Sequence, residues 1–263
     1  MIERLSKAVV DSAERVLANA YYRTVRLLRQ PMIKLGDLRY LEARREQKTF
    51  FYLRSIFSIW DPEDLVHLDL PWWTLKATEV VDDYLRNLDG NAVVFEFDGG
   101  ASTAWLAKRC ATVYTLDHDP EWTRRTALLC GAYSNVTYLT RSPDPASEPA
   151  GGRFISEKAG FRGVTFRNYV ESINSVEESF DMVVIDGRCR PESLLAAMSS
   201  IKDSGIILFD DSRRKRYQRP LVESGFHLKR YRGLGPGAPI GSETSILAPR
   251  SDTLERLDGI ATK

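Results

Sequence analysis

The stretch Val93-Val94-Phe95-Glu96-Phe97-Asp98-Gly99-Gly100-Ala101-Ser102-Thr103 decides the fold. Its first five residues form an apolar run typical of a buried strand, and small residues that can open a helix follow at once. Small residues let the backbone approach a ligand, and the amide groups at a helix N-terminus point at its anionic part. The stretch therefore predicts a strand, a ligand-binding turn and a helix.

Further apolar runs repeat this rhythm along the chain. Strands are predicted at 112–116, 136–139, 181–185 and 205–209, with helices at about 74–88, 103–109, 120–131 and 191–202. Two last strands, within 225–231 and 244–247, form a predicted hairpin, and the Pro- and Gly-rich segment 141–163 is predicted to be a long loop. Apolar strands separated by helices indicate a sheet covered on both faces. We expect an α/β fold with a doubly wound, mostly parallel seven-stranded sheet.

The domain organisation follows from where this rhythm begins and stops. We expect a helical N-terminal extension over residues 1–70, the α/β domain over 71–250 and a C-terminal tail over 251–263. The first fifty residues hold eleven Lys and Arg against six Asp and Glu, so the extension is locally basic. A helix is predicted over 1–30, ending at Gln30-Pro31, and a second over about 37–58. These helices either pack on the domain or on a second subunit in a homodimer, or residues 1–30 touch an anionic membrane surface.

Composition limits the classes of function. Thirty-seven Lys and Arg against thirty-six Asp and Glu give no basic excess, so no nucleic-acid partner is expected. The three cysteines are odd in number and lack the spacing of metal ligands, which favours a reducing compartment. No run reaches the roughly 20 apolar residues of a membrane-spanning helix, and the N-terminus lacks a secretory signal. We expect a cytoplasmic protein.

Acidic residues end the predicted strands at the edge where open α/β sheets bind ligands. Asp117 ends the second strand, 21 residues after Glu96, which is the usual spacing for a carboxylate that binds ribose hydroxyls. Either signal alone also fits an ordinary turn or a helix cap. The G-x-G-x-x-G fingerprint is absent, which disfavours a nicotinamide cofactor. Together the two signals predict an adenosine-bearing ligand.

Four segments in order resemble class I S-adenosylmethionine-dependent methyltransferases, and most of all a largely uncharacterised bacterial group. They are EFDGGASTAWLAKR (96–109), VYTLDHDPEW (113–122), FDMVVIDGRCR (180–190) and GIILFDDSRRKRY (205–217). The resemblance spans roughly residues 71–248 and implies S-adenosylmethionine as the cofactor.

The resemblance implies a cofactor site built from the first two strand ends. Glu96, Gly99, Gly100 and Ser102 would hold the methionine part, Asp117 the ribose, and His118 would lie beside the adenine. Asp98 stands where the group has its first glycine, which adds a negative charge near the cofactor's carboxylate. The alternative is therefore a non-catalytic nucleotide-binding or assembly protein that keeps the fold.

Catalytic residues are expected where the fourth and fifth strands end. Methyl transfer to a hydroxyl needs positioning and a group that takes the proton, and Asp186 is the first candidate, with Arg188 and Asp210 beside it. Asp186, Asp210 and Asp211 are also an alternative Mg²⁺ site, similar to that of catechol-type O-methyltransferases, although Asp211 replaces their Asn.

Arginines crowd the same edge of the predicted sheet, in the segments 188–190 and 213–216. They either neutralise the acids or bind an anionic small-molecule acceptor such as a carboxylate or a phosphorylated sugar. The sequence thus favours a methyltransferase acting on oxygen rather than nitrogen, with a small-molecule or sugar-type acceptor.

Overall fold

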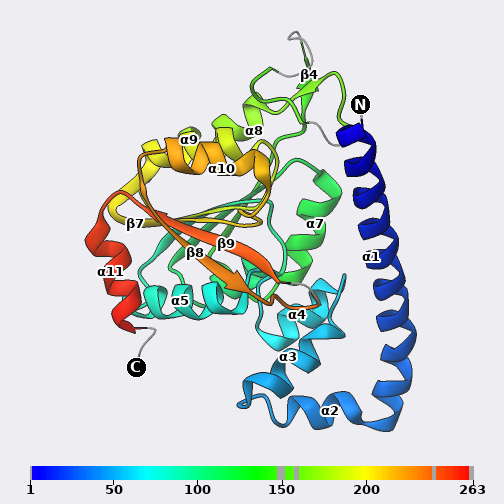
Figure 1. Ribbon diagram of the computed structural model, residues 1–263. Helices are drawn as coiled ribbons and strands as arrows, with labels where there is room; N and C mark the ends of the chain where they lie inside the picture. The colour runs from blue at the N-terminus through cyan, green and yellow to red at the C-terminus, as the bar shows by residue number, and fades with distance from the viewer. Residues whose placement is uncertain (1, 147–151, 157–159, 239–240, 261–263) are drawn as a thin grey trace.

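The computed structural model describes residues 2–146, 152–156, 160–238 and 241–260 (Figure 1). Residues 147–151 and 157–159 of the predicted 141–163 loop lie outside the described residues. No helix within the described ranges has the length and apolar character needed to cross a membrane.

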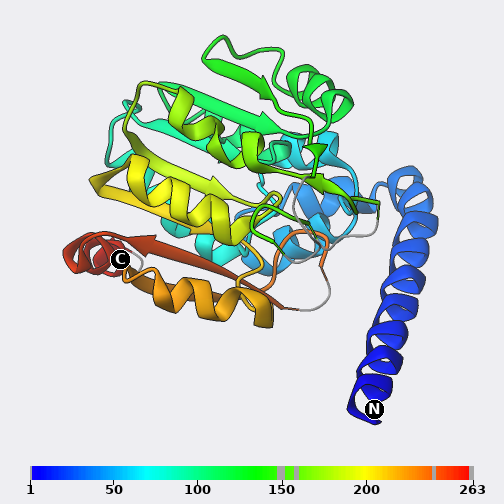
Figure 2. The same ribbon diagram turned by 90° about the horizontal axis from the view of Figure 1, so that it is seen from above.

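The N-terminal extension consists of helices. These are α1 (Ile2–Leu35), α2 (Asp37–Glu42), α3 (Lys48–Ile56) and α4 (Pro62–Leu68). Helix α1 runs along one side of the molecule and stands apart from the sheet (Figure 2).

The predicted end of the first helix at Gln30-Pro31 is wrong, because α1 continues through Pro31 to Leu35. Pro31 has no N–H to donate to the carbonyl of Leu27, four residues earlier. Leu27 is exposed, so water can donate to this carbonyl instead. The predicted single helix over 37–58 is wrong as well, because α2 and α3 are separated by a turn. Helix α3 begins after Gln47, whose backbone is extended. The turn before it contacts the end of α4, because Arg45 Nη2 donates to the carbonyl of Leu68 at 3.2 Å.

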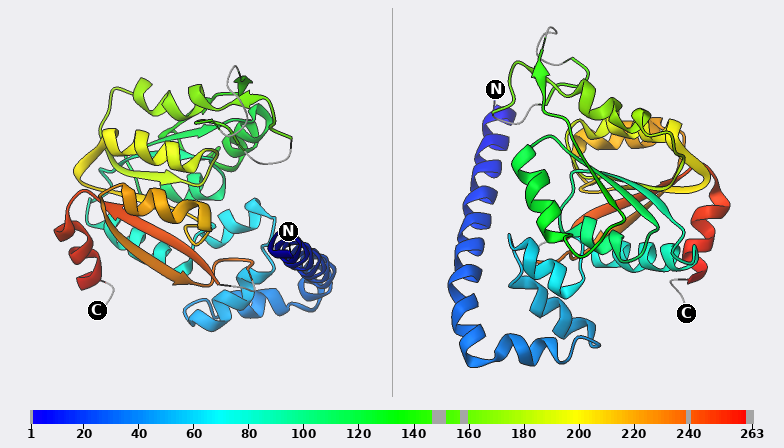
Figure 3. Two further views of the ribbon diagram at one scale, coloured as in Figure 1. Left: turned by 45° about the horizontal axis from the view of Figure 1, so that its top comes forward. Right: turned by 180° about the vertical axis from the view of Figure 1, so that it is seen from behind.

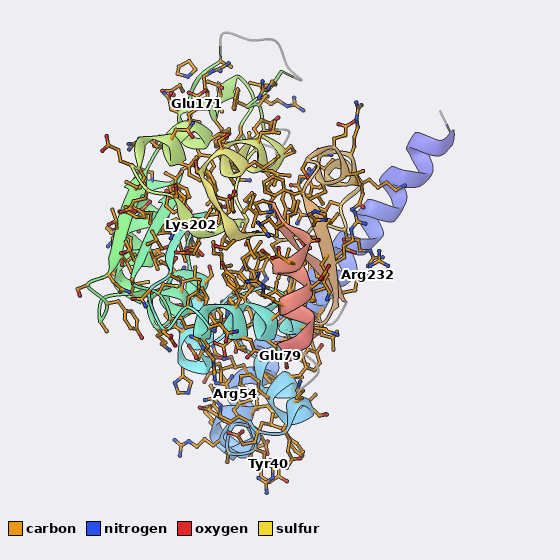
Figure 4. The ribbon with its side chains drawn as sticks, turned by 90° about the vertical axis from the view of Figure 1, so that its left-hand side faces the viewer. Tyr40, Arg54, Glu79, Glu171, Lys202 and Arg232 are labelled. Atoms are coloured by element: carbon orange, nitrogen blue, oxygen red, sulfur yellow. The ribbon has the colours of Figure 1, made fainter. Side chains whose placement is uncertain are left out.

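A buried guanidinium holds the extension together. The Arg54 residue is 4% exposed, and its two terminal nitrogens donate to the Asp64 carboxylate at 2.9 and 2.7 Å. Arg29 of α1 forms ion pairs with Asp61 and Asp64. Figure 4 shows Arg54 inside this group of helices and Tyr40 at its outer end. The Arg54–Asp64 ion pair therefore holds α3 against α4, and the ion pairs of Arg29 hold α1 there.

The sheet confirms the predicted fold class. Its seven strands lie in the order β3-β2-β1-β6-β7-β9-β8. The first five in this order are parallel: β3 (Val136–Thr140), β2 (Thr112–Asp117), β1 (Val93–Phe97), β6 (Phe180–Ile185) and β7 (Ile201–Phe209). The predicted hairpin is present, since β9 (Ser242–Ala248) is antiparallel to both β7 and β8 (His227–Gly233).

Helices cover both faces of the sheet, as Figure 3 shows. On one face α5 (Leu75–Arg86), α6 (Ala101–Ala107) and α11 (Ser251–Ile260) bury one apolar cluster. On the other face α8 (Arg167–Glu171), α9 (Arg190–Ser200) and α10 (Lys215–Glu223) bury a second. Helix α7 (Pro120–Leu129) joins β2 to β3, and the short helix η1 (Ser172–Ser175) follows α8. Strands covered on both faces explain the continuous apolar runs.

The segment expected as a C-terminal tail, 251–263, contains a helix in its described part. Residues 251–260 form α11, and Leu254 and Leu257 are 8% and 2% exposed within the first apolar cluster. The predicted loop over 141–163 also contains structure, since β4 (Asp144–Pro145) pairs with β5 (Val164–Thr165).

Candidate functional site

The turn after β1 is the first part of the candidate site. Asp98 has φ 67°, in the left-handed region that Asp tolerates better than most residues. A Cβ on Gly99 would lie 2.2 Å from Thr115 Oγ1 and 2.7 Å from Thr103 Oγ1, so glycine is required there. Trp122 of α7 donates its indole N–H to the Gly99 carbonyl at 2.7 Å. Gly100 and Ser102 then lead into α6. The sequence therefore folds this segment into a fixed turn at the carboxyl end of β1.

Glu96 lies beneath this turn and is fully buried. Its Oε2 accepts hydrogen bonds from Thr103 Oγ1 at 2.5 Å and Thr115 Oγ1 at 3.0 Å, whereas its Oε1 has no hydrogen-bond partner among the described residues. Burial raises the pKa of Glu96 to about 7, although nearby hydroxyls oppose the shift. Glu96 thus supports the turn from below and offers one oxygen without a hydrogen bond.

Two carboxylates meet one imidazole where β1 and β2 end. His118 Nδ1 lies 3.1 Å from Asp117 Oδ1 and 3.5 Å from Asp98 Oδ1. Burial lowers the pKa of His118, but its contacts with Asp117 and Asp98 outweigh burial and raise the pKa to about 9. Among the described residues these three are the group whose potential ligand atoms lie close enough to share a metal ion. A protonated His118 makes the group a charge pair instead, in which the imidazolium offsets part of the negative charge of Asp98.

Aromatic side chains cover the other side of His118. The ring centroids of Phe161 and Phe166 lie 5.4 and 5.6 Å from that of His118, and that of Tyr169 lies 6.3 Å away. The guanidinium of Arg188 lies 4.7 Å from the Phe161 ring centroid and 3.4 Å from His118 Nε2. Asp117 is only 5% exposed. The adenosine end of the predicted site is therefore filled by side chains in this structure.

A cavity of about 760 Å³ opens beside this cluster. It lies between the turn after β1, the turn after β6 and the start of α10. Its lining includes three acids and four arginines: Asp98, Asp186, Glu192, Arg188, Arg190, Arg214 and Arg216. Tyr217 also lines it and accepts a hydrogen bond from Arg216 Nη2 at 3.0 Å. The cavity thus joins the β1 turn to the predicted catalytic edge.

Asp186 faces this cavity at the end of β6. Its side chain is one-third exposed, and its Oδ1 accepts a hydrogen bond from Arg190 Nη2 at 2.5 Å. Burial in the surrounding protein and the neighbouring carboxylates raise the pKa of Asp186 well above its usual range, although Arg190 opposes the shift. A carboxylate with a raised pKa in a cavity is suited to accept a proton.

Asp210 and Asp211 are placed differently from Asp186. Asp210 is 8% exposed, does not line the cavity, and accepts a hydrogen bond from Thr244 Oγ1 at 2.7 Å. Burial and the charge of Asp211 raise the pKa of Asp210 to about 6. Asp211 forms an ion pair with Arg214.

The alternative Mg²⁺ site at Asp186, Asp210 and Asp211 is not supported. Arg190, which is 7% exposed, lies among these acids and donates to Asp186 Oδ1 and to the Asp210 carbonyl. Its Nη1 also lies 3.8 Å from Asp211 Oδ2. A guanidinium thus supplies the positive charge that a metal ion would supply.

The strand order decides the fold family. The order in which strands are added to the parallel sheet reverses at β1: β2 and β3 lie on one side of it, and β6 and β7 lie on the other. Strand β9 lies between β7 and β8 and is antiparallel to both. The strand order matches the Rossmann-like methyltransferase fold. In this methyltransferase fold the ends of β1, β2, β6 and β7 share the edge at which the cavity opens.

Comparisons with known proteins yield structural similarity alone. No family model and no curated protein matches the chain. The chain is similar to the precorrin 8W decarboxylase of Methanobacterium thermoautotrophicum, with 17% identity over 68% of this chain and 91% of that chain and a TM-score of 0.46. It is similar to an rRNA methylase of Streptococcus thermophilus, with 13% identity over 66% and 96% and a TM-score of 0.45. A Streptococcus mutans protein described as a methyltransferase, in complex with SAH, gives 16% identity over 65% and 96% and a TM-score of 0.44.

The residues of the methyltransferase fold's cofactor site fit an adenosyl amino acid in their chemistry. Asp117 has its carboxylate at the end of β2, where the ribose is expected, and Glu96 Oε1 is a buried oxygen beneath the turn with no hydrogen-bond partner among the described residues. Their fit requires one rearrangement, because Phe161 packs against His118 where the adenine is expected.

Sequence reasoning missed the aromatic part of the site. Phe161 lies near the end of the Pro- and Gly-rich segment 141–163, and Phe166 and Tyr169 follow it. The hydroxyl of Tyr169 donates to Asp98 Oδ1 at 3.4 Å. The usable signal was three aromatics within nine residues of a segment with otherwise polar character.

Proposed function

We propose that this protein is an S-adenosylmethionine-dependent methyltransferase that methylates a hydroxyl group of a small anionic acceptor. The observation that carries the proposal is that Asp98, from the cofactor turn, and Asp186, the expected base, line one cavity. A donor site and a proton acceptor within one enclosure meet the main requirement of a direct group transfer, which is positioning.

The proposed roles follow from the positions of the side chains. Asp117 accepts hydrogen bonds from the ribose hydroxyls, and the turn at 98–102 holds the amino-acid part. When bound, the cofactor supplies a methyl group on a positively charged sulfur. Asp186 would accept the proton that the acceptor hydroxyl loses when its oxygen is methylated. Arg190 orients the Asp186 carboxylate, and Asp210 stabilises Arg190 from the buried side.

An oxygen acceptor is favoured because the cavity offers an acid with a raised pKa as base. An anionic acceptor is favoured because Arg216 lines the cavity, and no carboxylate of the described residues lies within ion-pair distance of it. A carboxylate or phosphate on the acceptor suits the planar donors of a guanidinium.

The second candidate is a nucleotide-binding or assembly protein without turnover. The packing of Phe161 against His118 favours it, as does the ion pair between Asp98 and His118, because both occupy the site expected for the cofactor.

The test is calorimetric titration of the purified protein with S-adenosylmethionine and S-adenosylhomocysteine, with NAD as the control. Binding of the two adenosyl ligands alone supports the methyltransferase, and the protein should then release S-adenosylhomocysteine with an acceptor from a panel of hydroxy acids and sugar phosphates. Absence of binding contradicts it. If Asp98→Gly then restores binding, the non-catalytic candidate is correct.

A further inference from the structure

We propose that Asp98 and Arg188 bind the two charges of the cofactor's amino-acid end, with Asp98 taking the ammonium and Arg188 the carboxylate. This inference rests on the proposed function, and it assigns to cofactor binding an arginine that the sequence placed among the catalytic residues.

The two side chains are close neighbours in the site. A Cβ on Gly187, the residue before Arg188, would lie 3.2 Å from Asp98 Cγ, so the Asp98 carboxyl lies against this turn. Asp98 Oδ1 lies 3.5 Å from His118 Nδ1, and Arg188 Nε lies 3.4 Å from His118 Nε2. Both residues also line the cavity. The Asp98 carboxylate and the Arg188 guanidinium thus lie on either side of the His118 ring, beside the cavity.

Asp98 keeps the capacity to bind a cation. Its two described contacts, with His118 Nδ1 at 3.5 Å and with the Tyr169 hydroxyl at 3.4 Å, are both long for hydrogen bonds to a charged oxygen. Its left-handed backbone holds the carboxylate at the turn where a glycine was expected. A carboxylate at this point repels the carboxylate of the amino-acid end and attracts its ammonium.

Arg188 keeps the capacity to bind an anion. Within the described ranges, no carboxylate lies within ion-pair distance of its guanidinium, which contacts His118 Nε2 and the face of Phe161. Arg190, two residues later, differs in every respect, because it is buried and donates to Asp186, to the Asp210 carbonyl and to the Gly187 carbonyl. Arg190 is therefore committed to the protein, whereas Arg188 has guanidinium donors left for a ligand.

The pairing resolves the conflict that Asp98 creates. A zwitterionic amino acid presents one positive and one negative group a few ångströms apart, and an acid with an arginine on the neighbouring turn complements both. If the site bound only the carboxylate of the amino-acid end, Asp98 would repel that carboxylate and nothing would offset the repulsion. With Arg188 present, the negative charge of Asp98 becomes a means of orientation.

The experiment is a calorimetric cycle of three ligands and three variants. The ligands are S-adenosylhomocysteine, which carries both charges, its decarboxylated analogue, which carries the ammonium alone, and methylthioadenosine, which carries neither. The variants are Asp98→Asn, Arg188→Gln and, as the control for the loss of one positive charge, Arg219→Gln on α10, where Arg219 is exposed and pairs with Glu223.

Arg188→Gln should lower the affinity for S-adenosylhomocysteine about 10-fold to 100-fold, because a hydrogen bond to its carboxylate is lost. The affinity for the decarboxylated analogue, which has no carboxylate, should stay within about twofold. Asp98→Asn should lower the affinities for both amine-bearing ligands by a similar factor and leave the affinity for methylthioadenosine unchanged. Arg219→Gln should leave all three affinities unchanged.

An equal loss for all three ligands, or no loss for S-adenosylhomocysteine, overturns the inference while the proposed function stands. If the unmodified protein binds none of the three, the proposed function fails and the inference fails with it.

Discussion

Asp98 Oδ1 lies 3.5 Å from Nδ1 of His118, so the acid in the turn after β1 faces a histidine that follows the end of β2. Asp117 Oδ1 lies 3.1 Å from the same nitrogen. The imidazole therefore links the turn after β1 to the end of β2. Both the charge of the site and its closure by Phe161 depend on this ring.

His118 makes stability depend on pH. Its pKa is raised to about 9 in the folded protein, so its stabilising contribution is fully present below the unfolded value of about 6.5 and is lost as pH rises through 9. We expect the free energy of unfolding to fall by about 3 kcal/mol between pH 6 and pH 10 through this group. Urea unfolding of the protein and of His118→Gln at both pH values checks this. An equal decline in the two proteins would remove His118 as its source.

Asp186→Asn should lower turnover by about 100-fold to 10,000-fold, because the amide cannot accept the proton of the acceptor. The affinity for S-adenosylhomocysteine should change little. Glu192→Gln is the matched control, since Glu192 lines the same cavity and has no proposed role in the reaction. Turnover by Asp186→Asn at the rate of this control would show that the base lies elsewhere.

Phe161→Ala should raise the affinity for S-adenosylhomocysteine. The Phe161 ring packs on His118 with 5.4 Å between centroids, and the adenine must displace it. Loss of an aromatic contact of about 0.5–1.5 kcal/mol corresponds to an increase in affinity of up to about tenfold. Calorimetry measures it, with Tyr40→Ala as an exposed aromatic control far from the site. A weaker affinity would mean that Phe161 contacts the bound ligand instead.

Arg54→Met should destabilise the protein by about 3–5 kcal/mol, because it leaves the carboxylate of Asp64 in a buried position without its cation. Lys48→Met is the comparison. Lys48 pairs with Glu79 at 2.7 Å, but their side chains are 85% and 54% exposed, so its loss should cost about 0–1 kcal/mol. Chemical denaturation of both variants tests the contrast. Similar losses for the two would show that the Arg54 pair contributes no more than a surface pair.

Leu257→Ala should cost about 2–5 kcal/mol if α11 belongs to the domain core, because Leu257 is 2% exposed in the apolar cluster under the sheet. The control is Leu128→Ala on α7, where Leu128 is 71% exposed and the change should stay within about 0.5 kcal/mol. The midpoint of urea unfolding separates the two. An unchanged midpoint for Leu257→Ala would support the original expectation of a tail.

The central strands could be predicted because both of their faces are buried, so that their sequences are mainly apolar. Val93–Phe97 and Phe180–Ile185 are examples. The end of α1 could not, because the cost of Pro31 depends on whether water reaches the carbonyl four residues earlier. Residues 251–260 were missed because two buried leucines on one turn of helix are too few to give a periodic signal.

The candidate site divides in the same way. Its acids were predictable, because strand ends at one edge of a parallel sheet must lie together. The guanidinium of Arg190 among Asp186, Asp210 and Asp211 was not, because a run of arginines does not reveal which member turns inward. The contact between Phe161 and His118 joins segments with no pattern in common.

The position of β9 has a consequence for how the chain folds during synthesis. Strand β8 pairs with β9 alone, and β9 pairs with β7, so β8 has no neighbour in the sheet until residue 248 has left the ribosome. Until then β7 presents an unpaired edge, which is a template for pairing with other chains. The nascent chain thus carries an aggregation hazard that the finished sheet removes, and slowing translation over residues 210–248 should prolong it.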